Sequence, residues 1–456
     1  MDKKTHSEEK VKTSESTNAS TAKLAFCHEE GVEPYEPWKN RNLTHPLNNM
    51  GALFHMIKGS LGSGILAMPV AFKNGGLWVS LFCAVLVGVV YTHCVHILIY
   101  SCQILCTRLK LPRLGFAEIA EAAFRTGPTK WRKYSTAAKN IVDLGLFLGY
   151  YACCIVYVVF TASSLKQVIE HDFDVSMDVR LYILAVTVFV LPIGIIRNLK
   201  YLVPFSFIAI VALTFGCCFV LYDIFQDLPP LSSRPVFTSW SHLPLFFCTM
   251  IYAVDGIGTV LPIENAMSNP QRFLGCPGIL NASMVWLIAL YGTMGFFGYL
   301  RYGEETAGSI TLNISSSTMG QTVKLMVILN VLCSYGLFLY VPCEIVWRNI
   351  EGFIGKSRKT FKYYTMRVVL ILLTVVIATI VPDLEPFVGL VGAICSSTLV
   401  LFFPPVIELV TFWEDDKYMG PYRWKFYKNY ILIILWFITL VTGAHISLQK
   451  IIELYQ

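Results

Sequence analysis

The chain has 456 residues, of which 55% are hydrophobic and only 14% charged, with a formal net charge of +6 and a mean hydropathy of +0.57. Soluble proteins carry roughly a quarter charged residues, so the composition argues against a soluble globular protein. The basic residues lie in short stretches between apolar runs, as in membrane proteins, so the positive charge does not indicate a nucleic acid partner.

The first 45 residues are polar and charged, beginning MDKKTHSEEK, and lack the apolar core of a signal peptide. Their composition predicts a disordered tail over residues 1–45. Residues 46–456 hold apolar runs close to the roughly 20 residues needed to cross a bilayer. We therefore expect one all-α integral membrane domain over 46–456, with the lipid bilayer as its surroundings.

About eleven spanning segments are predicted along this domain. Their approximate ranges are 49–73, 77–104, 138–164, 180–198, 202–224, 242–265, 277–300, 320–348, 365–382, 384–411 and 429–452.

The charges between the segments predict the orientation of the chain. Basic residues gather after the second segment, after the eighth and before the last: Arg108, Lys110, Arg113, Arg125, Lys130, Arg132, Lys133, Lys356, Arg358, Lys359, Lys362, Arg423, Lys425 and Lys428. The loops on the opposite side are acidic and hold few bases. The positive-inside rule therefore places the N-terminal tail in the cytosol, and the odd number of segments places the C-terminus outside or in a lumen. Of four Asn-x-Ser/Thr sequences, only the one at Asn313 falls in an expected outer loop, so Asn313 is the candidate glycosylation site.

Two spanning segments carry similar interruptions. Residues 62–69 read GSGILAMP in the first segment, and residues 255–262 read DGIGTVLP in the sixth. Glycine and proline both weaken helices, and bare backbone at membrane depth is tolerated where it lines a cavity or is buried in protein. Paired interruptions in the two halves of a chain indicate a transporter binding site, with half-helix ends facing the charges of the substrate. A free amino acid carries both charges.

Other interpretations of these glycines are possible. Glycines also allow close helix packing. The glycines of GSLGSG do not have the order of a dinucleotide-binding fingerprint. The stretch also lacks the GK[ST] sequence of a phosphate-binding loop. Most of the 14 cysteines lie in apolar runs with no zinc spacing, so we expect no metal, cofactor or disulfide framework. No metal cluster or hydrolase motif suggests an enzyme.

Five stretches resemble signature sequences of the proton-coupled amino acid transporters, in the amino acid/auxin permease branch of the amino acid–polyamine–organocation superfamily. They read HMIKGSLGSGILAMPVAFKNGG, AVDGIGTVLPIENAM, GSITLN, YVPCEI and LVGAICSS, and the similarity covers residues 46–452. The resemblance implies eleven helices in a LeuT-like fold of two inverted five-helix repeats, with helices 1 and 6 broken. It also implies symport of protons with small neutral amino acids, at the plasma membrane or on late endosomes and lysosomes.

The resemblance also assigns site residues. It places Gly59, Ser60, Gly62, Ser63 and Gly64 around the substrate carboxylate. It implies that the stretch from Tyr252 to Gly258, which includes Asp255 and Gly256, offers backbone carbonyls to the amino group. His55 matches the histidine that the family uses for proton coupling, and histidine titrates near working pH.

Two departures from the family pattern matter. Family members often have glutamate where this chain has Asp255, which keeps the carboxylate on a shorter arm. The outer loops near residues 165–180 and 301–319 contain no cysteine, so the bridge found in vertebrate members is absent. The proton carrier is left open between His55 and Asp255, with structural roles as the alternative for each.

The expected function is therefore electrogenic, pH-dependent symport of alanine, glycine or proline with a proton. Some members of the family influence growth, so TOR nutrient signalling and a nutrient-signalling complex are further expectations. Two alternatives are an amino-acid sensor with little flux and a sodium-coupled symporter, whose ion site would use oxygens such as those of Ser396 and Ser397.

Overall fold

The computed structural model describes residues 35–453 and residue 455, except residues 42, 44–45, 174–176, 198, 276, 315–316 and 354–358. Regular structure in these residues is helical, apart from one isolated parallel bridge between Leu47 and Met267. Residues 1–34 of the predicted tail lie outside the described residues. The all-α fold class predicted from the apolar runs is confirmed.

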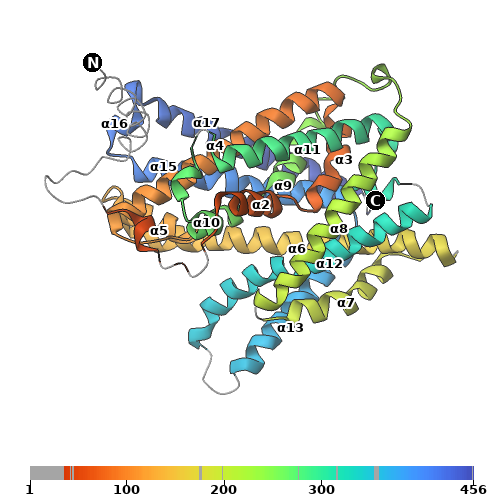
Figure 1. The fold of residues 1–456 in the computed structure, drawn as a ribbon, viewed down its shortest axis with the longest axis horizontal. Coiled ribbons are helices and arrows are strands. Elements are labelled where there is room, and N and C mark those ends of the chain that lie inside the picture. The colour runs from red at the N-terminus through yellow and green to blue at the C-terminus, as the bar shows by residue number, and fades with distance from the viewer. Residues whose placement is uncertain are drawn as a thin grey trace, which may run out of the picture.

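Helices follow one another with mostly short connections, and Figure 1 shows their arrangement. They are α2 (Asn49–Ser60), α3 (Met68–Gly75), α4 (Leu77–Leu109), α5 (Phe116–Thr126), α6 (Ser135–Phe173), α7 (Val179–Ile195), α8 (Leu199–Gln226), α9 (Leu243–Val254), α10 (Ile257–Ala266), α11 (Ile279–Tyr302), α12 (Thr318–Ile350), α13 (Lys359–Ile380), α14 (Leu384–Val391), α15 (Phe403–Thr411), α16 (Asp416–Met419) and α17 (Trp424–Glu453). Short 3-10 helices include η2 (Pro37–Asn40) and η3 (Ser63–Ala67), and residues 392–396 and 398–402 form π-helical turns between α14 and α15.

Nine helical stretches of the described chain are long and apolar enough to cross a membrane. α7 is a shorter apolar helix of 17 residues. The first expected segment is divided into α2, η3 and α3. Together these make up the eleven segments that the sequence predicts, so the protein is a multi-pass membrane protein.

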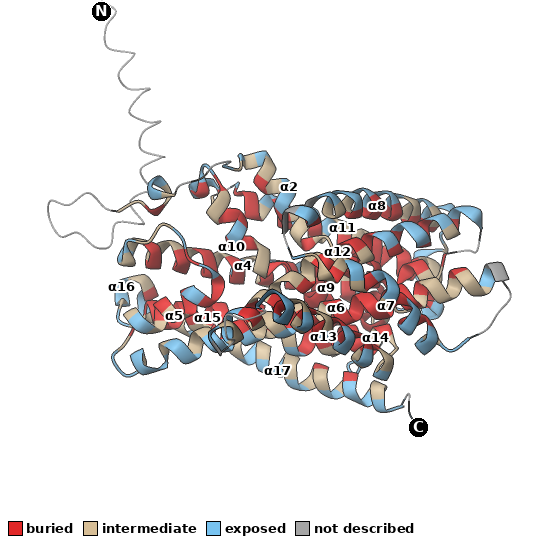
Figure 2. Ribbon diagram, turned by 90° about the horizontal axis from the view of Figure 1, so that it is seen from below, coloured by how far each residue is buried: buried red, intermediate tan, exposed pale blue. Residues whose placement is uncertain are grey.

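The buried core lies along the middle of the bundle. α6 packs against α12, α12 against α8, and α3 against α9 and α11. Figure 2 shows buried residues concentrated on α6, α9 and α12, while exposed residues follow the outer side of α17 and the ends of the bundle. Large apolar side chains are exposed on peripheral helices, such as Val188 on α7, Phe207 on α8 and Val376 on α13. An apolar exterior of this kind is what contact with lipid requires.

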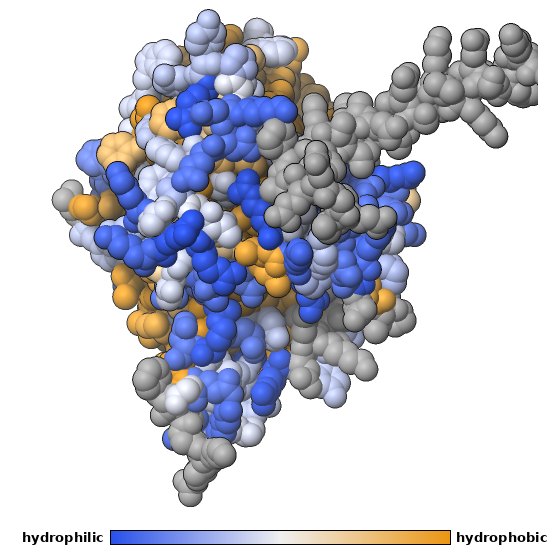
Figure 3. Space-filling model, turned by 90° about the vertical axis from the view of Figure 1, so that its left-hand side faces the viewer, coloured by the Kyte–Doolittle hydropathy of each residue, from blue (hydrophilic) through white to orange (hydrophobic). Residues whose placement is uncertain are grey.

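The bundle of helices has two ends. The N-terminal face is the end where α2 begins, and the vestibule face is the end where α3 stops at Gly75. α5 and α16 lie at the N-terminal face (Figure 1). Figure 3 looks onto this face and shows hydrophilic side chains over much of it, with hydrophobic ones along its left side and in a patch near its middle. The N-terminal face is therefore suited to water and headgroups rather than to hydrocarbon.

The two interrupted segments run in opposite directions. At the N-terminal face the N–H of Leu47 donates to the carbonyl of Ala266 at 2.8 Å, and the N–H of Ser268 donates to Leu47 at 2.9 Å. The start of the first segment therefore meets the end of the sixth. An inverted repeat requires this antiparallel relation between its corresponding segments.

Candidate functional site

The first interruption lies where the sequence predicts it. α2 ends at Ser60, Leu61 and Gly62 are not helical, and η3 begins at Ser63. Gly62 has extended backbone, with φ −113° and ψ −163°. Pro69 occupies one of the first two positions of α3, where its missing N–H costs no helical hydrogen bond. The stretch thus stops one helix and starts another.

The second interruption is shorter. α9 ends at Val254, Asp255 is extended with φ −65° and ψ 107°, and α10 begins at Ile257. The Asp255 carboxylate accepts from the N–H of Ile257 at 3.4 Å and so lies beside the start of α10. Pro262 differs from Pro69 because it lies inside α10 and does not end that helix. Both predicted breaks in helices 1 and 6 are confirmed.

The two interruptions touch each other through their backbones. A Cβ atom on Gly64 would lie 2.5 Å from the Cα of Ala253, and one on Gly256 would lie 2.4 Å from the Ser60 hydroxyl. At Gly64 the contact is with backbone, which cannot move aside. At Gly256 the nearest atom is a hydroxyl that can rotate, and the Cα of Ser60 lies 3.2 Å away. In contrast, a Cβ on Gly62 would meet only the Tyr157 hydroxyl, at 3.8 Å. Gly64 is therefore needed for packing, Gly256 lies in a tight contact, and Gly62 faces a less crowded space.

Two buried tyrosines from other helices form hydrogen bonds with backbone groups at the interruptions. The Tyr291 hydroxyl of α11 lies 2.6 Å from the carbonyl of Ser60 and 2.9 Å from that of Ala253, so it can donate to either. The N–H of Gly256 donates to the Tyr91 hydroxyl of α4 at 2.9 Å. Sequence reasoning missed both tyrosines. One general rule could have indicated them. A buried tyrosine needs a hydrogen-bond partner, and the backbone of an interrupted helix supplies one.

A small cavity of about 40 Å³ opens beside the second interruption. Its lining comes from the last turn of α2, the second interruption with the start of α10, and from α6, α12 and the π-helical stretch: Gly59, Gly149, Tyr150, Cys153, Asp255, Gly256, Ile257, Gly258, Thr259, Phe338 and Leu399. Four of the predicted site residues, Gly59, Asp255, Gly256 and Gly258, are thus brought together. Tyr150 and Phe338 are aromatic walls, with ring centroids 5.5 Å apart.

A second, narrower space of about 10 Å³ lies on the vestibule side of the interruptions. Ser63 and Tyr252 line it, together with Phe160 and residues that precede α12 and begin α14. Such a space holds about one water molecule, so no amino acid passes through it without movement. Ser63 and Tyr252 line this space and not the 40 Å³ cavity, although both belong to the predicted site.

Several backbone carbonyls predicted to face a substrate amino group already accept hydrogen bonds. The carbonyl of Ala253 faces Tyr291, and that of Gly256 accepts from the Thr259 hydroxyl at 2.8 Å. The carbonyl of Tyr252 accepts from the N–H of Asp255 at 3.3 Å. The Asp255 carboxylate is the charged group that lines the cavity, so it is better placed than these carbonyls to meet a cation.

The remaining predicted residues lie outside these spaces. His55 is exposed on α2 and is not among the residues that line either space. Ser60 is buried beneath the second interruption. Asn313 lies in the loop before α12, where its amide donates to the carbonyl of Glu305 at 2.7 Å and accepts from the N–H of Ala307 at 2.8 Å. Glycosylation at Asn313 stays a prediction.

A buried ion pair joins the segment before α2 to α10 at the N-terminal face. Arg41 lies 3.1 Å from the carboxylate of Glu264 on α10, and their side chains are only 3% and 1% exposed. Arg41 also donates to the carbonyl of Pro112 at 2.8 Å, and Gln103 of α4 donates to Glu264 at 3.1 Å. Removing one member of such a pair leaves an uncompensated buried charge, which costs about 3–5 kcal/mol. The segment before α2 thus holds α10 in place.

The chain matches the family described as transmembrane amino acid transporter protein over residues 45–449. It is 40% identical over 422 residues to the Drosophila melanogaster protein named "Proton-coupled amino acid transporter-like protein pathetic", covering 92% of this chain and 89% of that protein. It is 24% identical over 412 residues to "Probable amino acid transporter skat-1" of Caenorhabditis elegans, covering 88% of this chain and 90% of that protein.

Two solved structures of Mhp1, a nucleobase-cation-symport-1 family transporter, have a similar fold. The closed form with bromovinylhydantoin bound has a TM-score of 0.52 at 12% identity, covering 92% of this chain and 94% of Mhp1. The inward-facing form has a TM-score of 0.54 at 11% identity, covering 94% of each chain. At this identity the likeness concerns the fold alone, and it confirms the LeuT-like architecture.

Proposed function

This chain belongs to the transmembrane amino acid transporter family, and we propose that it is a proton-coupled symporter of small neutral amino acids such as alanine, glycine and proline. It is a membrane transporter and not an enzyme. The observation that carries the proposal is the meeting of two interrupted helices around a small space that contains one carboxylate, Asp255. The name of the Drosophila melanogaster relative adds support for the proton as the coupling ion.

The ends of the interrupted helices suit the two charges of an amino acid. η3 and α10 begin at the interruptions, and α2 and α9 end there. Helix N-termini favour anions and C-termini favour cations. The substrate carboxylate is assigned to the stretch from Gly59 to Gly64, and the ammonium to Asp255 and the backbone from Tyr252 to Gly258.

Substrate size follows from the walls of the site. The 40 Å³ cavity is bounded by Tyr150 and Phe338, and the narrower space by Tyr252 and Phe160. A glycine or alanine side chain requires little widening of these spaces, whereas a large side chain must displace aromatic rings that are packed against each other. The site therefore favours small substrates.

Proton coupling is assigned to Asp255 and His55. Asp255 is half-buried and lines the cavity, so a proton on its carboxyl group changes the charge that the substrate ammonium meets. His55 lies one and a half turns before the end of α2 on an exposed surface, where it can exchange protons with water. One positive charge then accompanies each neutral substrate, so transport is electrogenic.

Membrane location and orientation complete the proposal. The basic stretches around α5 and before α17 support a cytosolic N-terminal face. The plasma membrane or the late endosomal and lysosomal membrane is the site of action. A link to TOR nutrient signalling rests on the family resemblance.

Alanine-evoked current in expressing oocytes tests this function. The expected result is an inward current that grows as the external pH falls and that persists in sodium-free medium. A current that does not change with pH and that disappears without sodium would show that sodium, and not the proton, is the coupling ion. Binding of alanine to the purified protein with no current and no uptake would instead favour a sensor.

A further inference from the structure

The π-helical stretch between α14 and α15, residues 392–402, contributes to the wall of the 40 Å³ cavity. It contains two wide turns. In the first, the N–H of Ser397 donates to the carbonyl of Gly392. In the second, the N–H of Phe403 donates to the carbonyl of Thr398. Each bond spans one residue more than the bonds of an α-helix, and such turns are rare and occur mostly at functional sites.

The sequence explains why the backbone is wide at this point. Residues 402–405 read FFPP, and neither Pro404 nor Pro405 has an N–H. In an α-helix these two N–H groups would donate to the carbonyls of Val400 and Leu401. Because both donors are missing, the backbone alone does not hold the end of the stretch as an α-helix. Side-chain contacts therefore help to fix its shape.

Trp436 of α17 contacts both ends of the second wide turn. Its indole N–H donates to the Thr398 hydroxyl at 2.9 Å, and its ring centroid lies 4.4 Å from that of Phe402. The Thr398 hydroxyl in turn donates to the carbonyl of Ile394. The indole has a single donor and uses it on this turn, so Trp436 fixes the position of Thr398 relative to α17. Since α17 is the eleventh spanning segment, this support comes from outside the two five-helix repeats.

Leu399 follows Thr398 and lies on the cavity side of the same turn. It is buried, and it lines the 40 Å³ cavity together with Asp255 and Gly149. A Cβ atom on Gly149 would lie 3.0 Å from a methyl group of Leu399, so this side chain packs closely against α6. A shift of the turn carries Leu399 with it and changes the width of the cavity beside Asp255.

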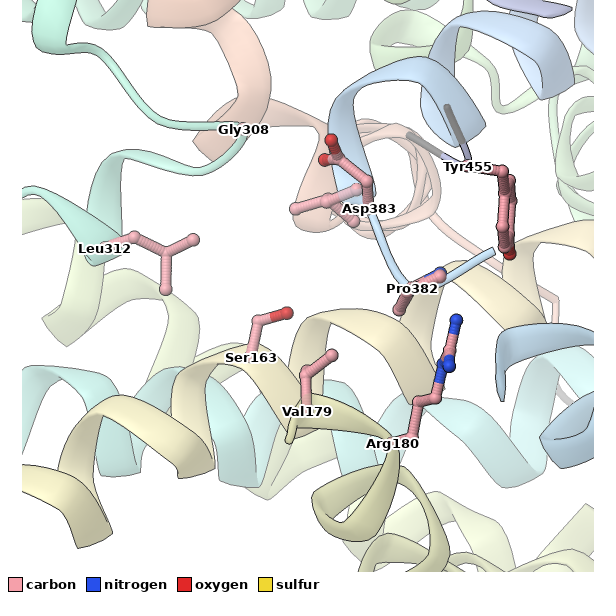
Figure 4. A pocket seen from close by; sticks show the side chains of 9 residues that line it. Ser163, Val179, Arg180, Gly308, Leu312, Pro382, Asp383 and Tyr455 are labelled. Atoms are coloured by element: carbon pink, nitrogen blue, oxygen red, sulfur yellow. The ribbon is translucent and has the colours of Figure 1, made fainter. Parts of the chain in front are cut away.

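The other two spaces do not involve this stretch. A larger cavity of about 320 Å³ opens at the vestibule face, with Ser163, Leu312 and Asp383 among its lining residues (Figure 4). Residues 392–402 are all described, and none of them lines this cavity or the 10 Å³ space. Among the three spaces, a change in the π-helical stretch therefore alters the 40 Å³ cavity.

We propose that Trp436 is a positioning residue for substrate size. By holding the second wide turn, it keeps Leu399 at the cavity wall, so the site accepts alanine more readily than amino acids with larger side chains. The inference rests on the proposed function, because it takes the amino acid to bind beside Asp255. It deepens that function by assigning part of the selectivity to α17, a helix that lines none of the three spaces.

Competition binding to the purified full chain in nanodiscs tests the proposal. Unlabelled alanine or valine displaces radiolabelled alanine, and the ratio of the two half-maximal concentrations gives the selectivity for the smaller side chain. Trp436→Phe keeps a ring beside Phe402 and removes the indole N–H. We expect the selectivity to fall about threefold to tenfold, the range that loss of one neutral hydrogen bond gives. A merely structural role would lower the amount of protein that binds alanine and leave this ratio unchanged.

Three further variants sharpen the test. Thr398→Val removes the acceptor of the same hydrogen bond and should lower the selectivity equally, so the result does not depend on one variant. Trp424→Phe is the matched control, because Trp424 lies on the same helix but is 51% exposed. Leu399→Val should lower the selectivity by itself. Adding Trp436→Phe to it should lower the selectivity by less than the product of the two single effects, because both act on one wall.

An unchanged ratio in Trp436→Phe and Thr398→Val would overturn the proposal, as would an equal fall in Trp424→Phe. Full multiplication of the two effects in the double variant would show that Trp436 does not act through Leu399, and would contradict it as well. A thermal melt at the wild-type temperature shows that a lower ratio does not come from misfolding.

The failure of this proposal is distinguishable from the failure of the proposed function. Proton-coupled uptake of alanine with an unchanged ratio in Trp436→Phe keeps the symporter and removes the role of Trp436. A lower ratio in Trp436→Phe, in a protein whose uptake does not respond to a proton gradient, keeps the role of Trp436 and removes proton coupling.

Discussion

The interruption in the first segment and the one in the sixth meet at one place, yet they are built from different chemistry. Gly62, Ser63 and Gly64 bring no charge, and Gly64 packs its backbone against Ala253 of the sixth segment. The second interruption brings Asp255, a carboxylate that lines the cavity. The comparison shows that the shape of the site depends on backbone, whereas its charge depends on one side chain.

Breaking the backbone contact is expected to have the largest effect. Gly64→Ala places a Cβ 2.5 Å from the Cα of Ala253, and backbone cannot move aside as a side-chain tip can. We expect loss of alanine uptake and a clearly lower melting temperature. Gly62→Ala is the matched control, since its Cβ meets only the Tyr157 hydroxyl at 3.8 Å, and its unfolding free energy should stay within about 0.5 kcal/mol of wild type. Equal sensitivity of the two positions would contradict the packing role of Gly64.

Removing the charge of the second interruption is expected to have the next largest effect. Asp255→Asn keeps the size of the side chain but cannot bind a proton or hold an ammonium as an ion. Alanine uptake should fall about tenfold to a hundredfold, the range that loss of one charged hydrogen bond gives, and the residual uptake should no longer respond to pH. Uptake measured from acid to neutral pH checks this. A variant whose uptake still rises with acidity would show that the proton is carried elsewhere.

Tyr291→Phe tests the group that joins the two interruptions. Without its hydroxyl, the buried carbonyls of Ser60 and Ala253 lose a shared donor. The unfolding free energy should fall by about 1–3 kcal/mol, with weaker uptake. Tyr222→Phe is the control, because Tyr222 is 60% exposed on α8. If both variants melt at the same temperature as wild type, Tyr291 does not hold the interruptions together.

His55→Ala is expected to have the smallest effect on the site itself. His55 lies on the exposed side of α2 and lines neither space, so its loss should weaken the stimulation of uptake by acid while substrate affinity changes little. Uptake against pH at normal surface expression is the measurement. An unchanged pH profile would remove His55 from proton coupling and leave Asp255 as the carrier.

The sequence predicts features that depend on local chemistry. Runs of apolar residues mark the spanning segments, and glycines beside serines or aspartate mark both interruptions. Contacts between distant segments could not be predicted in this way. Tyr291 meets Ser60 across 231 positions of sequence, and Arg41 meets Glu264 across 223. Arg41 even falls within the stretch predicted as a tail, because the buried partner that fixes it belongs to another segment.

Uptake of radiolabelled alanine into sodium-free proteoliposomes of the purified protein tests the central claim most directly. With an inwardly directed proton gradient and the membrane potential clamped, the wild type should concentrate alanine, and Asp255→Asn should not. Accumulation in the absence of any proton gradient, or equal accumulation by Asp255→Asn, would contradict a proton-coupled site built from the two interruptions.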